Sequence, residues 1–155
     1  MRNCLWRQFF HLNMKQNGPF RKRILLVEGN PRLREAIRLL LYIEGHTVTE
    51  AENGRRACLL YTPGDFDLVI TDYAMPQMKG DELARTLKCL VPTQPILMIT
   101  SEVQISSSDT PVDALLQSPF KMAELRRIVA SLLSSERLNV PRFQGCGAGL
   151  STPVE

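Results

Sequence analysis

The chain has no long apolar run and no cysteine pattern of the kind that binds metals or forms a disulfide framework. A membrane-spanning helix needs ~20 consecutive apolar residues, and no segment of the 155-residue sequence approaches that length. No C-x-x-C pair or cysteine–histidine cluster indicates a zinc site. Scattered free thiols fit a reducing cytosol, so we expect a cytoplasmic protein with no membrane span. The four cysteines are Cys4, Cys58, Cys89 and Cys146.

Acidic residues are absent from positions 1–23, which contain six lysines and arginines. Because the whole chain has a net charge of +3, the remaining residues carry about −3. The basic character therefore belongs to the N-terminal segment, and the rest of the chain gives no support for direct nucleic-acid binding. Apolar residues in this segment could line a helix face on a membrane surface or in a partner groove. We favour a disordered basic extension over residues 1–22, or a start codon placed too early, with Met14 as the true start.

The common nucleotide-binding and hydrolase motifs are missing as well. The first apolar run is followed by Glu28-Gly29-Asn30-Pro31 and not by G-x-G-x-x-G. No G-x-x-x-x-G-K-[ST] loop and no G-x-S-x-G turn occurs. We therefore expect that the chain is not an enzyme and that it binds no organic cofactor.

Short apolar runs are present, and segments with helical spacing separate them. Three continuous runs indicate strands buried on both faces of a sheet, one alternating run indicates an edge strand, and a fifth run is short. In that order the runs are Ile24–Val27, Leu68–Thr71, Ile96–Ile99, Thr47–Ala51 and Ala114–Leu116.

The segments between these runs carry helix signals, including asparagines suited to cap a helix start. The predicted helices run from Pro31 to about Gly45, from Gly54 through Tyr61, through Leu83–Leu90, and through Met122–Leu132. The connection from Glu102 to Pro111 has poor helical patterning. From about Ser134 the composition becomes loop-like, which predicts a flexible tail over residues 136–155.

Strands that alternate with helices predict an α/β fold with a parallel sheet covered on both faces. In such folds the functional residues collect at the carboxyl ends of the strands. The polar residues expected at that edge are Glu28, Asp72, Thr100 and Ser118. Carboxylates and hydroxyls suit a hard cation or a phosphoryl group. Taken without its context, Asp72 could instead be a helix or turn cap.

Five ordered motifs carry a more specific signal than any single residue. They are Ile24–Asn30, Phe66–Asp72, Met75–Gly80, Pro95–Thr100 and Ser118-Pro119-Phe120. In order and spacing they resemble the receiver domain of two-component response regulators. The resemblance implies a receiver domain over residues 23–135. It also implies a doubly wound, flavodoxin-like (βα)5 fold with a five-stranded parallel sheet in the strand order 2-1-3-4-5.

The resemblance also implies residue roles. Asp72 matches the phosphoacceptor, which takes a phosphoryl group from a phosphohistidine in a partner kinase. Thr100 matches the switch hydroxyl, which turns toward the phosphoryl group. Glu28, Asp72 and the backbone carbonyl of Ala74 would hold Mg²⁺, which the reaction needs because donor and acceptor are both negative.

Three departures from the family pattern suggest a partly degenerate receiver. Gly29 stands where a second acidic residue is expected, so Mg²⁺ binding should be weak. Ser118 stands where a lysine would pair with the phosphoryl oxygens. Leu115 replaces an aromatic residue of the signalling face. Lys79 or Lys121 could reach the pocket instead, although a solvated surface lysine is the simpler interpretation of each.

Two functions therefore remain open. The first is a stand-alone receiver that accepts a phosphoryl group on Asp72 from a histidine kinase or phosphotransfer protein. The second is a pseudo-receiver that docks partners without phosphorylation. The sequence beyond the receiver is too short and too glycine-rich for a DNA-binding output domain, so output to a downstream protein target is expected through protein–protein contact, with a homodimer possible.

Overall fold

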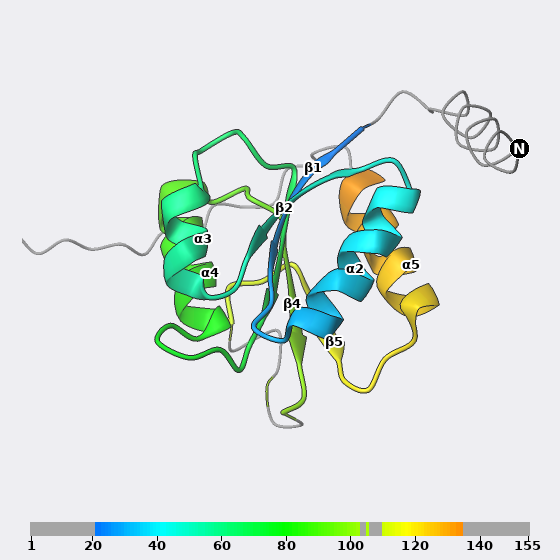
Figure 1. Cartoon of the computed structure of the whole chain (residues 1–155). Coiled ribbons are helices and arrows are strands. Elements are labelled where there is room, and N and C mark those ends of the chain that lie inside the picture. The colour runs from blue at the N-terminus through cyan, green and yellow to red at the C-terminus, as the bar shows by residue number, and fades with distance from the viewer. Residues whose placement is uncertain (1–20, 103–104, 106–109, 135–155) are drawn as a thin grey trace, which may run out of the picture.

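The computed structural model describes residues 21–102, 105 and 110–134, which form five strands and four helices (Figure 1). The predicted extension over residues 1–22 lies almost wholly outside the described residues. The predicted tail over residues 136–155 lies entirely outside them, so the domain boundaries stay a prediction. In chain order the elements are β1 (Arg23–Val27), α2 (Pro31–Ile43), β2 (Thr47–Ala51), α3 (Gly54–Leu60), β3 (Leu68–Asp72), α4 (Gly80–Leu90), β4 (Ile96–Thr100), β5 (Ala114–Gln117) and α5 (Met122–Ser134).

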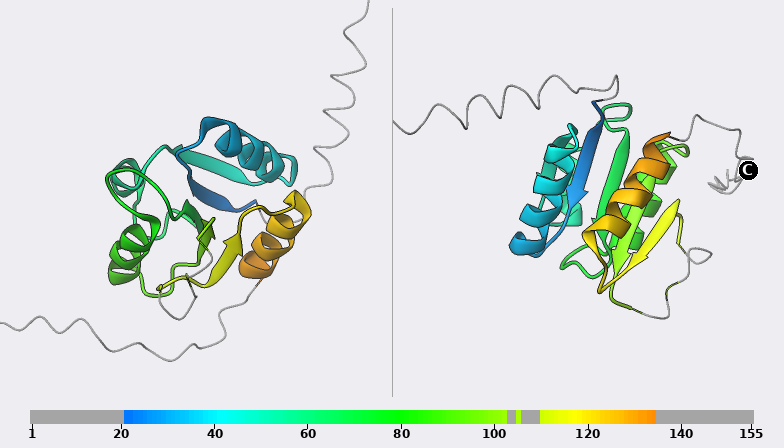
Figure 2. Two further views of the ribbon diagram at one scale, coloured as in Figure 1. Left: turned by 90° about the horizontal axis from the view of Figure 1, so that it is seen from below. Right: turned by 90° about the vertical axis from the view of Figure 1, so that its right-hand side faces the viewer.

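All five strands pair in parallel in the order β2-β1-β3-β4-β5, as predicted. Helices α2 and α5 cover one face of the sheet, and α3 and α4 cover the other (Figures 1 and 2). The alternating run Thr47–Ala51 lies at a sheet edge, also as predicted.

The sheet separates two apolar cores because successive side chains of a strand point to opposite faces. Leu25 and Val27 of β1 pack toward α3 and α4, whereas Ile24 and Leu26 pack toward α2 and α5. All four side chains are completely buried. The continuous apolar runs are explained by this double coverage.

Asparagine caps fix where the helices begin. Asn30 Oδ1 accepts hydrogen bonds from the Arg32 and Leu33 amides at 3.0 and 3.4 Å, with Pro31 as the first helical residue. Asn53 Oδ1 caps α3 in the same way. The described residues between β4 and β5 form no helix, in agreement with the poor pattern there. No helix in the described part of the chain is long and apolar enough to cross a membrane.

Candidate functional site: an acidic edge of the sheet

The carboxyl ends of β1, β3 and β4 meet at one edge of the sheet. Val27 is in register with Thr71, so the next residues, Glu28 and Asp72, lie on neighbouring strand ends. Asp72 is in turn in register with Ile99, next to Thr100. Parallel pairing therefore brings together the three side chains that the sequence singled out.

Asp72 ends β3 in a half-buried position. Burial raises the pKa of its carboxyl above the ordinary value, and the backbone N–H groups of Ala74 and Tyr73 offset part of that rise. The carboxylate is thus less hydrated than that of a surface aspartate.

Glu28 is almost fully buried, with 3% of its surface exposed. Its Oε1 accepts a hydrogen bond from the Asn30 amide at 2.8 Å. Burial is the main cause that raises the pKa of Glu28, and the negative charge of Asp72 raises it further. The two carboxyls therefore act as an acidic pair that a cation would stabilise.

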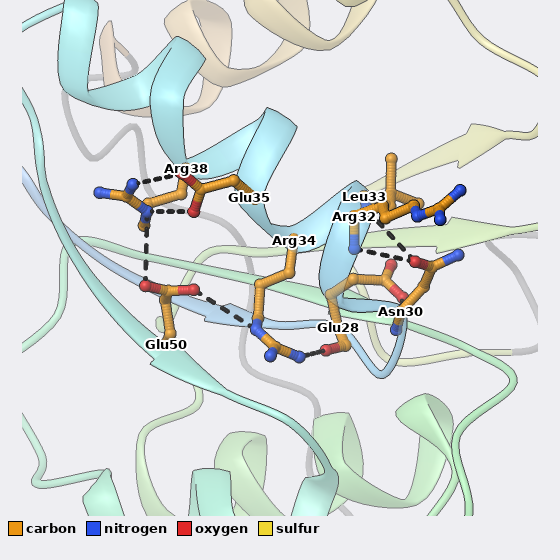
Figure 3. Close-up of polar contacts among 8 residues, drawn as sticks. All are labelled: Glu28, Asn30, Arg32, Leu33, Arg34, Glu35, Arg38 and Glu50. Carbon is orange, nitrogen blue, oxygen red and sulfur yellow. Dashed lines mark hydrogen bonds and ion pairs between the residues drawn. The ribbon is translucent and has the colours of Figure 1, made fainter.

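Arg34 ties this edge to the neighbouring strand, an arrangement that the sequence did not reveal. Its Nη1 donates to the Glu28 carbonyl oxygen at 2.6 Å, and its Nε lies 3.3 Å from Glu50 Oε2 (Figure 3). Arg38 continues the network from Glu50 to Glu35. Because two acceptors hold Arg34, the loop that carries Glu28 is fixed to β2.

The donor set of this edge fits a hard cation. Glu28 and Asp72 supply carboxylate oxygens, and the Ala74 carbonyl can supply a third protein oxygen, which are the ligand types that Mg²⁺ prefers. The described residues contain no group of three or more histidine, cysteine or acidic side chains suited to a metal. A bound Mg²⁺ would therefore keep most of its coordination sites for water or a ligand.

Thr100 lies at the end of β4 with 1% of its surface exposed. Its Oγ1 accepts a hydrogen bond from the Glu102 amide at 3.0 Å. Its carbonyl accepts one from the Ser118 amide at 2.7 Å. A hydroxyl that accepts a bond still has its own proton to donate, so Thr100 can bind an anion at this edge.

Two of the three departures lie at this edge of the sheet: Gly29 follows Glu28, and the Ser118 amide bonds to the Thr100 carbonyl. Gly29 is exposed, and a Cβ built on it would meet only the Glu52 carbonyl oxygen, at 3.7 Å. Packing therefore does not exclude a carboxylate there. Ser118 precedes Pro119 through a cis peptide bond and supplies no positive charge.

Neither of the two alternative lysines pairs with Asp72. Lys79 Nζ lies 5.5 Å from the centre of the Tyr73 ring, and Lys121 is exposed before α5. Gly80 has a separate role that the sequence did not reveal. A Cβ there would lie 2.3 Å from the Asp72 carbonyl oxygen, so only glycine permits this close approach.

Comparison with known proteins agrees with this architecture. The family described as "Response regulator receiver domain" matches residues 24–130. The chain is 33% identical over 131 residues to the transcriptional regulatory protein TcrA of Mycobacterium tuberculosis, covering 82% of this chain but 51% of that protein. It is 34% identical to the response regulator receiver protein CpdR of Brucella abortus, covering 72% of this chain and 97% of CpdR. The chain thus spans about half of one curated relative and nearly all of another.

Solved structures show the same fold. The response regulator TrrA of Thermotoga maritima in complex with Mg²⁺-BeF has a TM-score of 0.67 and 32% identity, over 72% of this chain and 99% of TrrA. TrrA in complex with the histidine kinase ThkA has a TM-score of 0.66 and 34% identity, over 73% and 99%. The chain belongs to the response regulator receiver domain family, the signalling module of two-component phosphorelays.

Proposed function

We propose that Asp72 accepts a phosphoryl group from a phosphohistidine in a histidine kinase or phosphotransfer protein. The observation that carries this proposal is the acidic pair of Glu28 and Asp72 on neighbouring strand ends, where Arg34 holds the main chain of Glu28. The complex of TrrA with its histidine kinase supports this class of partner.

The transfer is a displacement at phosphorus. The phosphorus–nitrogen bond of the donor breaks, and its electron pair stays on the imidazole nitrogen, which takes up a proton. A phosphorus–oxygen bond forms with one carboxylate oxygen of Asp72. Later attack by water breaks this bond and returns the carboxylate and inorganic phosphate.

The chain's own residues orient and neutralise the groups in this step. Mg²⁺, when bound, supplies positive charge between the carboxylates and the incoming phosphoryl group. Glu28 and Asp72 would hold it together with the Ala74 carbonyl, and we expect weak binding because Gly29 adds no ligand. The Thr100 hydroxyl would donate a hydrogen bond to a phosphoryl oxygen.

Signal output would then follow from the movement of Thr100. Its hydroxyl oxygen accepts a bond from the Glu102 amide, which begins the connection to β5. A reoriented hydroxyl would change this connection and alter the surface offered to a downstream protein. In this proposal the chain is a signalling module and not an enzyme, and it works in the cytoplasm. Self-association of the chain stays a prediction.

A pseudo-receiver that docks partners without phosphorylation is the second candidate. Gly29 and Ser118 favour it, because the pocket lacks one carboxylate ligand and one fixed positive charge. Both losses weaken the phosphorylated state, since each removes a favourable interaction of that state.

Intact-mass measurement after incubation with Mg²⁺ and acetyl phosphate separates the two functions. We expect one phosphoryl adduct that is lost in Asp72→Asn and kept in Asp65→Asn, a surface aspartate with 56% of its side chain exposed. If the wild-type chain forms no adduct while the double variant Gly29→Asp, Ser118→Lys does, the pseudo-receiver is correct. If neither chain forms an adduct, the assignment of this pocket is wrong.

A further inference from the structure

Lys79 occupies a position that does not favour a lysine. It is the N-cap residue of α4, and its side chain makes no capping hydrogen bond, whereas Asn30 and Asn53 cap α2 and α3. The first-turn amides are left without this acceptor, and the positive end of the helix dipole repels a cation. The structure of α4 alone therefore gives no reason for a lysine here.

Lys79 is nevertheless close in space to the acceptor strand. The Gly80 amide donates to the Tyr73 carbonyl at 3.0 Å, and the backbone of Gly80 packs against the carbonyl of Asp72. The loop after Asp72 thus folds back, and Lys79 stands one residue from this contact. Its four-carbon stem is flexible, so the ammonium group can sample the space around the end of β3.

The resting partner of Lys79 is weak and neutral. Its Nζ lies 5.5 Å from the ring centre of Tyr73, the residue that directly follows Asp72. In the described part of the chain no carboxylate forms an ion pair with Lys79. A cation–π contact at an exposed site is weaker than a charge-assisted bond to a phosphoryl oxygen. A phosphoryl group on Asp72 would therefore compete well for this ammonium.

Other cations are less suited to the role. Arg34 is held by the Glu28 carbonyl and by Glu50. Lys121 lies three residues beyond Ser118, directly before α5, where its backbone carbonyl accepts hydrogen bonds from the amides of Glu124 and Leu125. Ser118 has no charge to offer.

We propose that Lys79 is the phosphoryl-binding cation of this receiver, in place of the residue at position 118. When Asp72 carries a phosphoryl group, the Lys79 ammonium leaves the Tyr73 ring and donates to a phosphoryl oxygen. This inference rests on the proposed role of Asp72. The positive charge then comes from Lys79, in the loop after β3, and not from the connection between β5 and α5.

Beryllofluoride with Mg²⁺ is a suitable probe, because it mimics a phosphoryl group on an aspartate. Binding to the full chain can be followed by amide chemical shifts around Asp72. We expect Lys79→Met to weaken beryllofluoride binding about tenfold, equivalent to about 1.4 kcal/mol, and Lys121→Met to leave it unchanged. Adding Ser118→Lys to Lys79→Met should restore most of the lost affinity.

Lys79→Asp adds a readout that a merely structural role would not give. An aspartate at the N-cap should raise the melting temperature because it caps α4, while beryllofluoride affinity falls further than in Lys79→Met. If the wild-type chain binds beryllofluoride and Lys79→Met binds it as tightly as Lys121→Met does, the inference about Lys79 is wrong and the proposed function stands. If the wild-type chain itself binds no beryllofluoride, both are wrong.

Discussion

Gly29→Asp tests directly whether position 29 faces the cation site. The substitution is sterically free, since the new Cβ meets only the Glu52 carbonyl oxygen at 3.7 Å and Gly29 is exposed. Its effect should therefore be electrostatic. In metal-free buffer the third carboxylate repels Glu28 and Asp72, whose pKa values are already raised. At water-like dielectric this repulsion costs about 1 kcal/mol of folding stability.

With Mg²⁺ bound, Gly29→Asp should instead increase the stability of the folded chain. Two unit charges 4 Å apart interact by ~4 kcal/mol at an effective dielectric constant of ~20, and the divalent cation doubles this attraction. Dehydration of the cation and the carboxylate removes most of the gain. A net tightening of about tenfold in Kd, or ~1.4 kcal/mol, is the conservative expectation. At saturating Mg²⁺ the extra stabilisation corresponds to roughly 5 °C in melting temperature for a domain of this size.

Thermal unfolding with EDTA and with Mg²⁺ measures both effects, and Gly29→Asn is the matched control. The asparagine has the same shape as the aspartate but no charge. We expect the Mg²⁺-induced rise in melting temperature to be larger in Gly29→Asp than in the wild-type chain or in Gly29→Asn. Equal rises in the two variants would refute the reasoning, because position 29 would then not face the cation.

Two further predictions concern the backbone and the charge of the acceptor strand. Gly80→Ala should lower the free energy of unfolding by about 1–3 kcal/mol or more, because its Cβ would lie 2.3 Å from the Asp72 carbonyl oxygen. Urea unfolding measures this loss. An equally large loss in Gly29→Ala would contradict the explanation. Asp72→Asn should be more stable than the wild-type chain near pH 7 in metal-free buffer. Because burial raises the pKa of Asp72 in the folded state, the wild-type chain loses stability as pH rises from the unfolded to the folded pKa of this carboxyl, and the variant does not. The difference in folding stability between the variant and the wild-type chain should therefore vanish in acid. A difference that stays constant across pH would contradict the assigned role of the Asp72 carboxyl.

The fold could be predicted because its signals are local. Continuous apolar runs indicated strands covered on both faces, and Asn30 and Asn53 marked the starts of two helices. The order of the strands came from the resemblance to receiver domains and not from any local pattern. It was confirmed by the pairing of the strands.

The candidate site could be predicted only in part. Strand ends placed Glu28, Asp72 and Thr100 at one edge, and the structure brings them together there. The contact of Arg34 with Glu50 could not be predicted, because it depends on the conformations of two long side chains that no sequence pattern gives. The same limit applies to the buried bond from Tyr61 Oη to Gln94 Oε1 at 2.9 Å, which joins residues 33 positions apart.

The position of Lys79 was also beyond sequence reasoning. Whether its ammonium extends into solvent or lies over Tyr73 depends on how the loop after Asp72 folds back. That fold includes the close approach of Gly80 to the Asp72 carbonyl, a contact that no sequence pattern indicates.

The two apolar cores have a consequence for how this lineage can change. Neither core includes Glu28, Gly29, Asp72, Thr100 or Ser118. Substitutions at the exposed Gly29 and the half-buried Ser118 can therefore change the pocket without opening a cavity in either core. Two substitutions, Gly29→Asp and Ser118→Lys, would supply the missing carboxylate and the missing cation while both cores stay unchanged. The chain preserves the scaffold on which selection could restore a complete pocket.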